Sequence, residues 1–189
     1  MKQKILHLII IFFFLSTNSF SKNLKFTKII DLDKPWGSSF ISNNEIIITE
    51  KGGKIKIVNI KNRNTREINH NLNFLEYGQG GLLDIIYKDG FVWISYTEDR
   101  GNLKTSTSIA KAKFNRKKIF FKNIFQANPP IDSGNHFGSR LAIKDNYIFA
   151  SIGERGQGMI AQDTRSHPGS IIRIHLDGTI PIDNPKFKE

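Results

Sequence analysis

The sequence predicts an all-β protein, and three observations lead to that prediction. After Lys22 the apolar residues come in short runs rich in Ile, Val, Phe and Tyr. Gly, Asn, Asp and Lys separate these runs, and no long window carries apolar residues at helical spacing. Runs of β-branched and aromatic residues between such turn residues are typical of strands. The third observation is that the runs recur as an ordered set.

A polar turn, an apolar run and a glutamate form the clearest repeated unit. It occurs three times, as NNEIIITEKGG, KDGFVWISYTED and KDNYIFASIGERG. Glu50, Glu98 and Glu154 mark the end of the apolar run in each unit. Another apolar run precedes each unit (WGSSFI, GLLDIIY and FGSRLAI), and an alternating run follows it (KIKIVNI, SIAKAKF and SIIRIHL). Three consecutive strands are therefore expected in every unit.

A fourth, outer strand is expected in the first two units, over residues 65–68 and 118–125, whereas the third unit ends in IPIDNPKFKE. Four-stranded units that repeat after roughly 40–50 residues are typical of β-propeller blades. Blades bury their faces by stacking around an axis, and the innermost strands end at a central channel. A β-sandwich is the alternative, but its strands rarely recur as ordered sets of four. The pattern predicts a β-propeller, with about three four-stranded blades in this chain.

The N-terminus has the layout of a secretory signal. Lys2 and Lys4 precede an apolar run over residues 5–15, which a polar STNSFS stretch follows. A membrane anchor is the alternative, but spanning a bilayer takes roughly 20 apolar residues. We therefore expect a signal peptide over residues 1–21, no stable membrane span, and a mature chain over residues 22–189. That chain is expected to be secreted across the inner membrane into the periplasm.

Composition excludes several other classes. The chain has no cysteine, so it has neither disulfides nor thiolate metal sites. Its formal charge is +11, but the lysines are scattered, and the densest cluster (residues 116–118) falls in a predicted turn. Without a basic patch interleaved with aromatic residues, we expect no nucleic-acid binding. The glycine-rich GERGQG segment lacks the Gly-Lys-Ser/Thr ending of a phosphate loop.

His136 is the candidate general base. It lies in SGNHFGSR, directly before the innermost strand of the third unit, and this position puts its imidazole at the mouth of the propeller channel. Histidine titrates near neutrality and can accept a proton at working pH. A purely structural loop histidine is the alternative.

Two further polar residues are predicted near that channel. Gln79 lies in YGQGGLLDI, at the matching position of the second unit, where its amide can donate to and accept from a sugar hydroxyl. A simple turn residue is the alternative for Gln79. Glu154, at the end of the third apolar run, can orient His136 as the acid of a catalytic pair. The alternative is a salt bridge from Glu154 to Arg155 or Arg140.

The segments GNHFGSRLAI, IFASIGERGQG and AQDTRSHPGSIIRIHLDGTIPIDNP, in this order, resemble the PQQ-dependent sugar dehydrogenases of the glucose/sorbosone dehydrogenase family. The resemblance runs from about residue 31 to residue 187. It implies a six-bladed propeller that oxidises a hydroxyl of a sugar, with pyrroloquinoline quinone (PQQ) held by calcium as hydride acceptor. It also implies that His136 is the base, that Glu154 is its acidic neighbour, and that Gln79 contacts the substrate. Gln157 is a further candidate substrate contact.

The chain also departs from the family pattern. Asn135 stands where some members have aspartate, and the spacing after Glu154, which places Gln157 and Gln162, differs as well. The family's Arg-Asn pair, its calcium ligands and its quinone-binding basic residues are expected beyond Glu189. We therefore expect an N-terminal half that holds no metal and is inactive alone. The alternative function is a non-enzymatic propeller that binds a carbohydrate or a protein partner.

Overall fold

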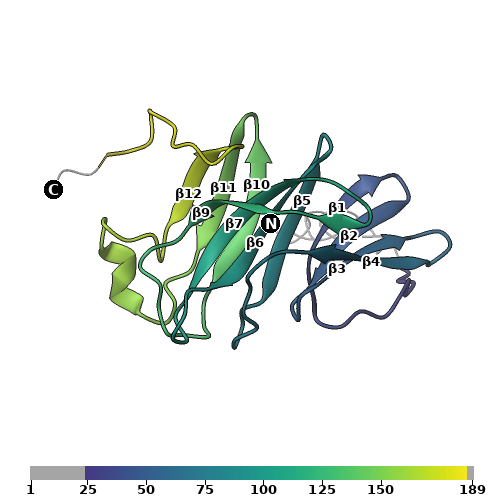
Figure 1. The fold of residues 1–189 in the computed structure, drawn as a ribbon, viewed down its shortest axis with the longest axis horizontal. Coiled ribbons are helices and arrows are strands. Elements are labelled where there is room, and N and C mark those ends of the chain that lie inside the picture. Colours follow the sequence, from purple (N-terminus) through teal and green to yellow (C-terminus); the bar gives the residue numbers. More distant parts are fainter. Residues whose placement is uncertain (1–23, 187–189) are drawn as a thin grey trace, which may run out of the picture.

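The computed structural model describes residues 24–186, and it is built almost entirely from strands. Three sheets follow one another in chain order and lie side by side (Figure 1). The one helical element of the described part is a single 3-10 turn, η1, at Gly158–Gln162. The predicted signal peptide lies outside the described residues. No helix within residues 24–186 is long and apolar enough to cross a membrane.

The order of strands within each sheet follows the repeated units. Sheet 1 contains β1 (Pro35–Ser42), β2 (Glu45–Glu50), β3 (Lys54–Asn59), β4 (Thr65–His70) and β8 (Lys118–Ile119). Sheet 2 contains β5 (Leu82–Lys88), β6 (Phe91–Asp99), β7 (Thr105–Lys113) and β9 (Lys122–Gln126). Sheet 3 contains β10 (Gly138–Lys144), β11 (Tyr147–Ile152) and β12 (Ile171–His175). Every hydrogen-bonded pair is antiparallel except β4 with β8. The all-β prediction and the three successive sheets are confirmed.

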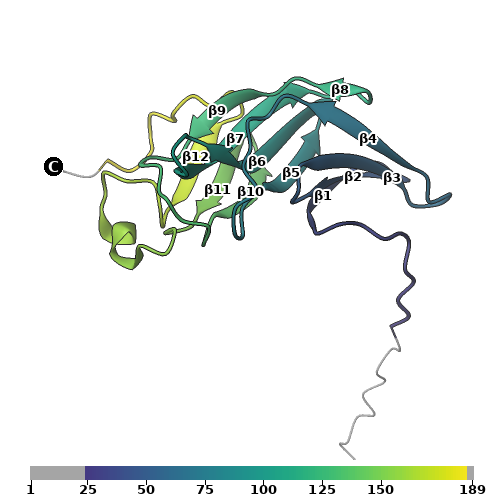
Figure 2. The same cartoon turned by 60° about the horizontal axis from the view of Figure 1, so that its bottom comes forward.

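The predicted outer strand over residues 118–125 is wrong in one respect, because the structure divides it between two sheets. Its first part, β8, pairs in parallel with β4 of sheet 1, and its second part, β9, pairs with β7 of sheet 2 (Figure 2). Between β8 and β9 the Asn71 side chain hydrogen-bonds to the backbone of Phe121. It accepts from the Phe121 N–H at 2.7 Å and donates to the Phe121 C=O at 3.1 Å. These two bonds satisfy the Phe121 backbone without a ladder, so the strand breaks there.

The core consists of two apolar clusters, one on each side of sheet 2. Because successive side chains of a strand point to opposite faces, Ile94 of β6 packs toward sheet 1 and Trp93 packs toward sheet 3. Ile47 and Ile57 meet Ile94 in the first cluster. This arrangement explains why seven of the nine residues of β6 are buried, since both faces of the strand are covered.

The predicted glutamate at each strand end is correct for two of the three sheets. Glu50 is the last residue of β2, and Glu98 is the second-to-last residue of β6. In sheet 3, however, β11 ends at Ile152, so Glu154 lies in the following loop rather than on the strand. The chain leaves the ladder because Gly153 donates its N–H to the carbonyl of Phe137 instead. That exchange brings Glu154 toward the segment that carries His136.

Candidate active site

His136 lies in the loop that leads into β10, as predicted, and its side chain is half exposed. Its backbone has φ +48°, in the left-handed region, where a non-glycine residue costs about 1–3 kcal/mol. A residue keeps such a conformation only where neighbouring groups fix it. The structure supplies those groups from the turn before β5, the loop after β11 and strand β7.

Glu154 is hydrogen-bonded to the imidazole of His136. The bond joins Glu154 Oε1 to His136 Nδ1, and the same oxygen accepts the N–H of Gly156 at 3.1 Å. The hydrogen bond from His136 holds the pKa of the Glu154 carboxyl below its ordinary value. The carboxylate is therefore charged at neutral pH and can accept a hydrogen from Nδ1. Neither predicted alternative holds, since the ion pair of Arg140 is with Asp84 and Arg155 donates to backbone and hydroxyl oxygens.

Gln79 reaches the same loop from the turn before β5. Its side-chain Oε1 accepts the backbone N–H of His136 at 2.9 Å, and the backbone N–H of Gln79 donates to the carbonyl of Gly134 at 2.7 Å. Gln79 is thus both a turn residue and a contact of the His136 loop. Because an N–H must be met by an oxygen, the amide is oriented with its NH2 group away from the His136 backbone.

Gly153 lets the two loops of the site approach closely. A Cβ atom at this position would lie 1.9 Å from the carbonyl oxygen of His136, far inside any real contact. Only glycine therefore allows the chain after β11 to pass under His136. The glycine pattern of the sequence carried this signal, but not the identity of the segment that comes close.

We expect Gly153→Ala to displace the His136 loop and to lower the free energy of unfolding by about 1–3 kcal/mol, the usual cost of overpacking. Gly52→Ala is the matched control, because a Cβ there would meet only the flexible carboxylate end of Glu76 at 3.3 Å. Urea unfolding of both variants measures the difference. Equal stability of the two variants would contradict the close approach.

Asp84 anchors the start of the candidate site to sheet 2. It is 3% exposed on β5, and its carboxylate accepts from the Arg140 guanidinium at 2.9 Å and the Leu141 N–H at 2.8 Å. Both donors belong to β10, a few residues after His136. Ser95 of β6 adds a third bridge, donating to the carbonyl of Ser139 at 2.6 Å. The innermost strands of sheets 2 and 3 are therefore tied together beside His136.

The two glutamines singled out after Glu154, Gln157 and Gln162, lie at the two ends of η1. Gln157 is exposed immediately before η1, and its backbone N–H donates to the carbonyl of Glu154 at 3.0 Å. Gln162 is exposed at the end of η1. Neither side chain has a hydrogen bond to His136, Glu154 or Gln79. No group of three or more His, Cys, Asp or Glu side chains within residues 24–186 is placed to hold a metal ion.

Arg155 is the residue that the sequence did not reveal. Its side chain is buried beneath the His136 loop, and burial lowers the pKa of its guanidinium to about 10. The sequence suggests it only as an alternative ion-pair partner of Glu154. Its contacts come from segments 18 to 50 residues away, which no local pattern could indicate.

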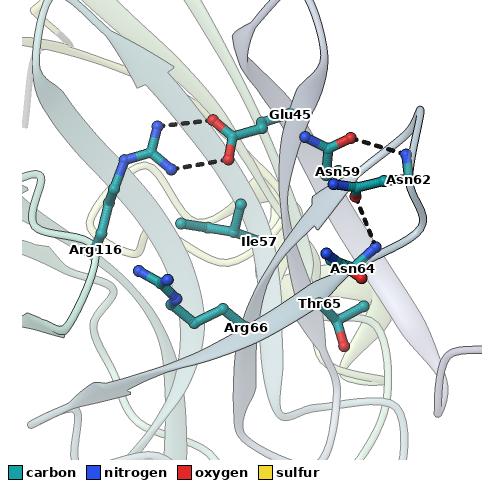
Figure 3. A pocket seen from close by; sticks show the side chains of 8 residues that line it. All are labelled: Glu45, Ile57, Asn59, Asn62, Asn64, Thr65, Arg66 and Arg116. Atoms are coloured by element: carbon teal, nitrogen blue, oxygen red, sulfur yellow. Dashed lines mark hydrogen bonds and ion pairs between the residues drawn. The ribbon is translucent and has the colours of Figure 1, made fainter.

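A polar pocket lies in sheet 1, near the start of β2 (Figure 3). Arg116 crosses it and donates two hydrogen bonds to Glu45, at 2.9 and 2.7 Å. The side-chain hydrogen bond from Arg116 holds the pKa of Glu45 below its ordinary value. The two charges compensate each other, and this ion pair links the start of β2 to the segment before β8.

Comparison with known proteins gives consistent results. The family model described as glucose/sorbosone dehydrogenase matches residues 32–189. Aldose sugar dehydrogenase YliI of Escherichia coli is 32% identical over 168 residues, covering 84% of this chain and 45% of that protein. Quinoprotein glucose dehydrogenase B of Acinetobacter calcoaceticus is 27% identical, covering 83% and 40%. The chain thus spans less than half the length of these curated relatives.

Solved structures agree on the architecture. The apo-form of the soluble aldose sugar dehydrogenase from Escherichia coli superposes with a TM-score of 0.78 at 31% identity, covering 84% of this chain and 48% of that one. The PQQ-bound aldose sugar dehydrogenase from Streptomyces coelicolor superposes with a TM-score of 0.73 at 22% identity, covering 82% and 48%. The second likeness supports the fold alone, and both confirm that the three sheets are propeller blades. With the family model matching nearly all of its described residues, this chain belongs to the glucose/sorbosone dehydrogenase family.

Proposed function

We propose that this chain carries the general base of an exported quinoprotein sugar dehydrogenase, and that His136 is that base. The observation that carries the proposal is the hydrogen bond between His136 and Glu154, formed in the loop before β10 beside Gln79. A half-exposed imidazole oriented by a charged carboxylate is the arrangement that accepts a proton from an approaching hydroxyl.

The hydrogen bond to Glu154 assigns the two imidazole nitrogens different tasks. Nδ1 carries the hydrogen that is donated to the carboxylate, so Nε2 keeps its lone pair. Nε2 is the atom that removes the hydroxyl proton of the sugar. The positive charge that then develops on the ring lies next to Glu154, which stabilises it.

Gln79 supports the choice of a hydroxylated substrate. Since its Oε1 is occupied by the His136 backbone, its NH2 group is the part left to meet a ligand. An amide N–H donates to oxygen, and a sugar supplies hydroxyl and ring oxygens. We propose that Gln79 orients the sugar while it fixes the base, and that Gln157 contacts the sugar from the loop before η1.

The chemistry of this site needs an electron acceptor, because proton removal alone does not oxidise an alcohol. The exposed imidazole and the free amide fit a sugar whose reacting carbon faces such a group. When bound, PQQ supplies the two-electron acceptor that takes the hydride from that carbon. His136 receives the proton, and the C–OH group becomes C=O.

The relatives extend the proposal to the whole protein. Relatives named aldose sugar dehydrogenase and quinoprotein glucose dehydrogenase support a sugar substrate and PQQ. We propose that residues 22–189 form the N-terminal part of a six-bladed propeller that is exported to the periplasm by a signal peptide over residues 1–21. Calcium, with ligands from outside the described residues, completes the proposed cofactor site.

Dye reduction by the complete gene product, supplied with PQQ and calcium, tests this proposal. We expect PQQ-dependent turnover with a panel of aldoses. The competing function is a propeller that only binds carbohydrate. Saturable binding of aldoses without any PQQ-dependent dye reduction would reject the dehydrogenase in its favour.

The pH dependence of stability tests the His136–Glu154 bond separately. Folding lowers the pKa of Glu154 below its ordinary 4.5, so the unfolded state binds the proton more readily. The contribution of the carboxylate is therefore complete above about pH 4.5 and is lost as the pH falls through the lower folded-state pKa. We expect the wild type to be more stable than Glu154→Gln at neutral pH, and the difference to shrink at an acidic pH below the folded-state pKa of Glu154. Chemical unfolding at both pH values measures this difference; a constant difference contradicts the bond.

A further inference from the structure

Arg155 contacts the chain on both sides of His136. It is 2% exposed, and its Nε–H donates to the carbonyl of Asn135 at 2.9 Å. Its guanidinium lies 3.7 Å from the centre of the Phe137 ring, and Nη2 also donates to the carbonyl of Ser133. The residues directly before and after His136 are thus held by one planar group.

The other side of the same guanidinium is fixed to sheet 2. Nη1 donates to the carbonyl of Thr105 at 3.0 Å, and Nη2 donates to its hydroxyl at 2.8 Å. Thr105 is the first residue of β7, and its backbone forms two further hydrogen bonds with Ile131, at 3.0 and 2.9 Å. Arg155 therefore connects the His136 loop with a strand of the core.

The hydrogen-bond partners of this arginine argue for a geometric role. Among the ion pairs of residues 24–186, none involves Arg155, and its acceptors are three carbonyls and one hydroxyl. A buried cation without a carboxylate is unfavourable, so simple stabilisation does not explain it. A planar fork that stacks on an aromatic ring while donating in several directions is specific to arginine.

Two residues in this arrangement have a left-handed backbone conformation. The φ angles are +48° for His136 and +61° for Arg155, and residues other than glycine rarely adopt such angles. Thr107 of β7 adds one more bond to the loop, donating to the carbonyl of Phe137 at 2.8 Å. Such conformations persist where the surroundings over-determine them.

We propose that Arg155 is a positioning residue that holds the His136 loop in its left-handed conformation, so that the imidazole of His136 points at the substrate. The proposal rests on the proposed function of His136 as the base. It does not require Arg155 to touch the substrate. Its effect is exerted through Asn135 and Phe137, the two neighbours of His136 in the chain.

The variant Arg155→Lys keeps the charge and removes the fork and the stacking. In the complete, PQQ-loaded protein we expect kcat to fall by about 100-fold, the cost of a displaced catalytic group. The KM for the sugar and the Kd for PQQ are expected to stay within about threefold. Arg165→Lys is the matched control, since its exposed side chain pairs only with Asp163 of its own loop. Wild-type kcat in Arg155→Lys would overturn the proposal.

A double-mutant comparison separates positioning from general damage. In a His136→Ala background, Arg155→Lys is expected to leave the residual turnover unchanged, because the group that it positions is gone. An equal fall in both backgrounds would assign Arg155 a merely structural role. If Arg155→Lys does not fold, Thr105→Val removes one acceptor of the guanidinium and is expected to lower kcat at least about threefold, the low end of what one hydrogen bond contributes. Wild-type kcat in that variant would overturn the proposal as well.

A measurement without turnover separates this proposal from the proposed function. In NMR spectra of the chain, Arg155→Lys is expected to move the imidazole resonances of His136 and to leave those of His175 in place. His175 lies on β12, at the far end of sheet 3. Unmoved His136 resonances would overturn the positioning role. Moved resonances together with wild-type turnover in His136→Ala would leave the geometry correct and reject the base.

Discussion

Replacement of His136 by alanine is expected to lower kcat of the complete, PQQ-loaded protein by about 10²–10⁴-fold, the usual contribution of a general base. In the proposed mechanism Nε2 of the imidazole accepts the hydroxyl proton, because Nδ1 is hydrogen-bonded to Glu154 Oε1, which also accepts the Gly156 N–H. Steady-state dye reduction with a saturating aldose measures the loss. The Kd for PQQ is expected to stay unchanged, because His136 is proposed to act on the sugar and not to bind PQQ.

His175→Ala provides the matched control for this prediction. His175 is half-buried on β12, and its ring packs against Tyr147, 5.0 Å between centroids, away from the candidate site. The same loss of an imidazole there is expected to leave kcat within about twofold. Turnover of His136→Ala within the same range would remove His136 as the base.

The largest expected effect on stability comes from Asp84. Replacing it by alanine leaves the N–H groups of Leu141 and Ile85 without their acceptor in a buried interface. A buried donor without a partner costs about 1–3 kcal/mol, so we expect a loss of about 3 kcal/mol in the free energy of unfolding. At the usual 2–4 °C per kcal/mol for a chain of this length, the melting temperature should fall by about 6–12 °C.

Arg140→Gln separates the buried bonds of Asp84 from its ion pair. The Arg140 side chain is 68% exposed, so its bond with Asp84 is largely screened by solvent and contributes less than about 1 kcal/mol. A large loss in Asp84→Ala with a small loss in Arg140→Gln is the expected pattern. Equal losses would mean that the ion pair, and not the backbone donors, joins sheets 2 and 3.

The blades and the position of His136 before β10 were predictable because both depend on local pattern. Short apolar runs with their turns defined β1 to β7 and β10 to β12, and the run GSRLAI placed the start of β10 directly after His136. The equivalent run in sheet 2 placed Gln79 before β5 in the same way. A repeat that recurs in order leaves little freedom in which strand is innermost.

The failures have a common physical origin in contacts between distant segments. The break at Phe121 depends on the side chain of Asn71, 50 residues earlier. Burial of Arg155 depends on Thr105 and Phe137, which lie 50 and 18 residues earlier in the chain. Neither outcome is encoded within a window that periodicity can examine.

The tautomer of His136 tests the central claim most directly. The claim is that Glu154 holds the hydrogen on Nδ1, so that Nε2 is free to take the proton of a sugar hydroxyl. Nitrogen-15 NMR of the imidazole at neutral pH distinguishes the two nitrogens. We predict a protonated Nδ1 and an unprotonated Nε2 in the wild type, and loss of this preference in Glu154→Ala. A hydrogen on Nε2 in the wild type would contradict the account, because the proposed base would then have no lone pair facing the substrate.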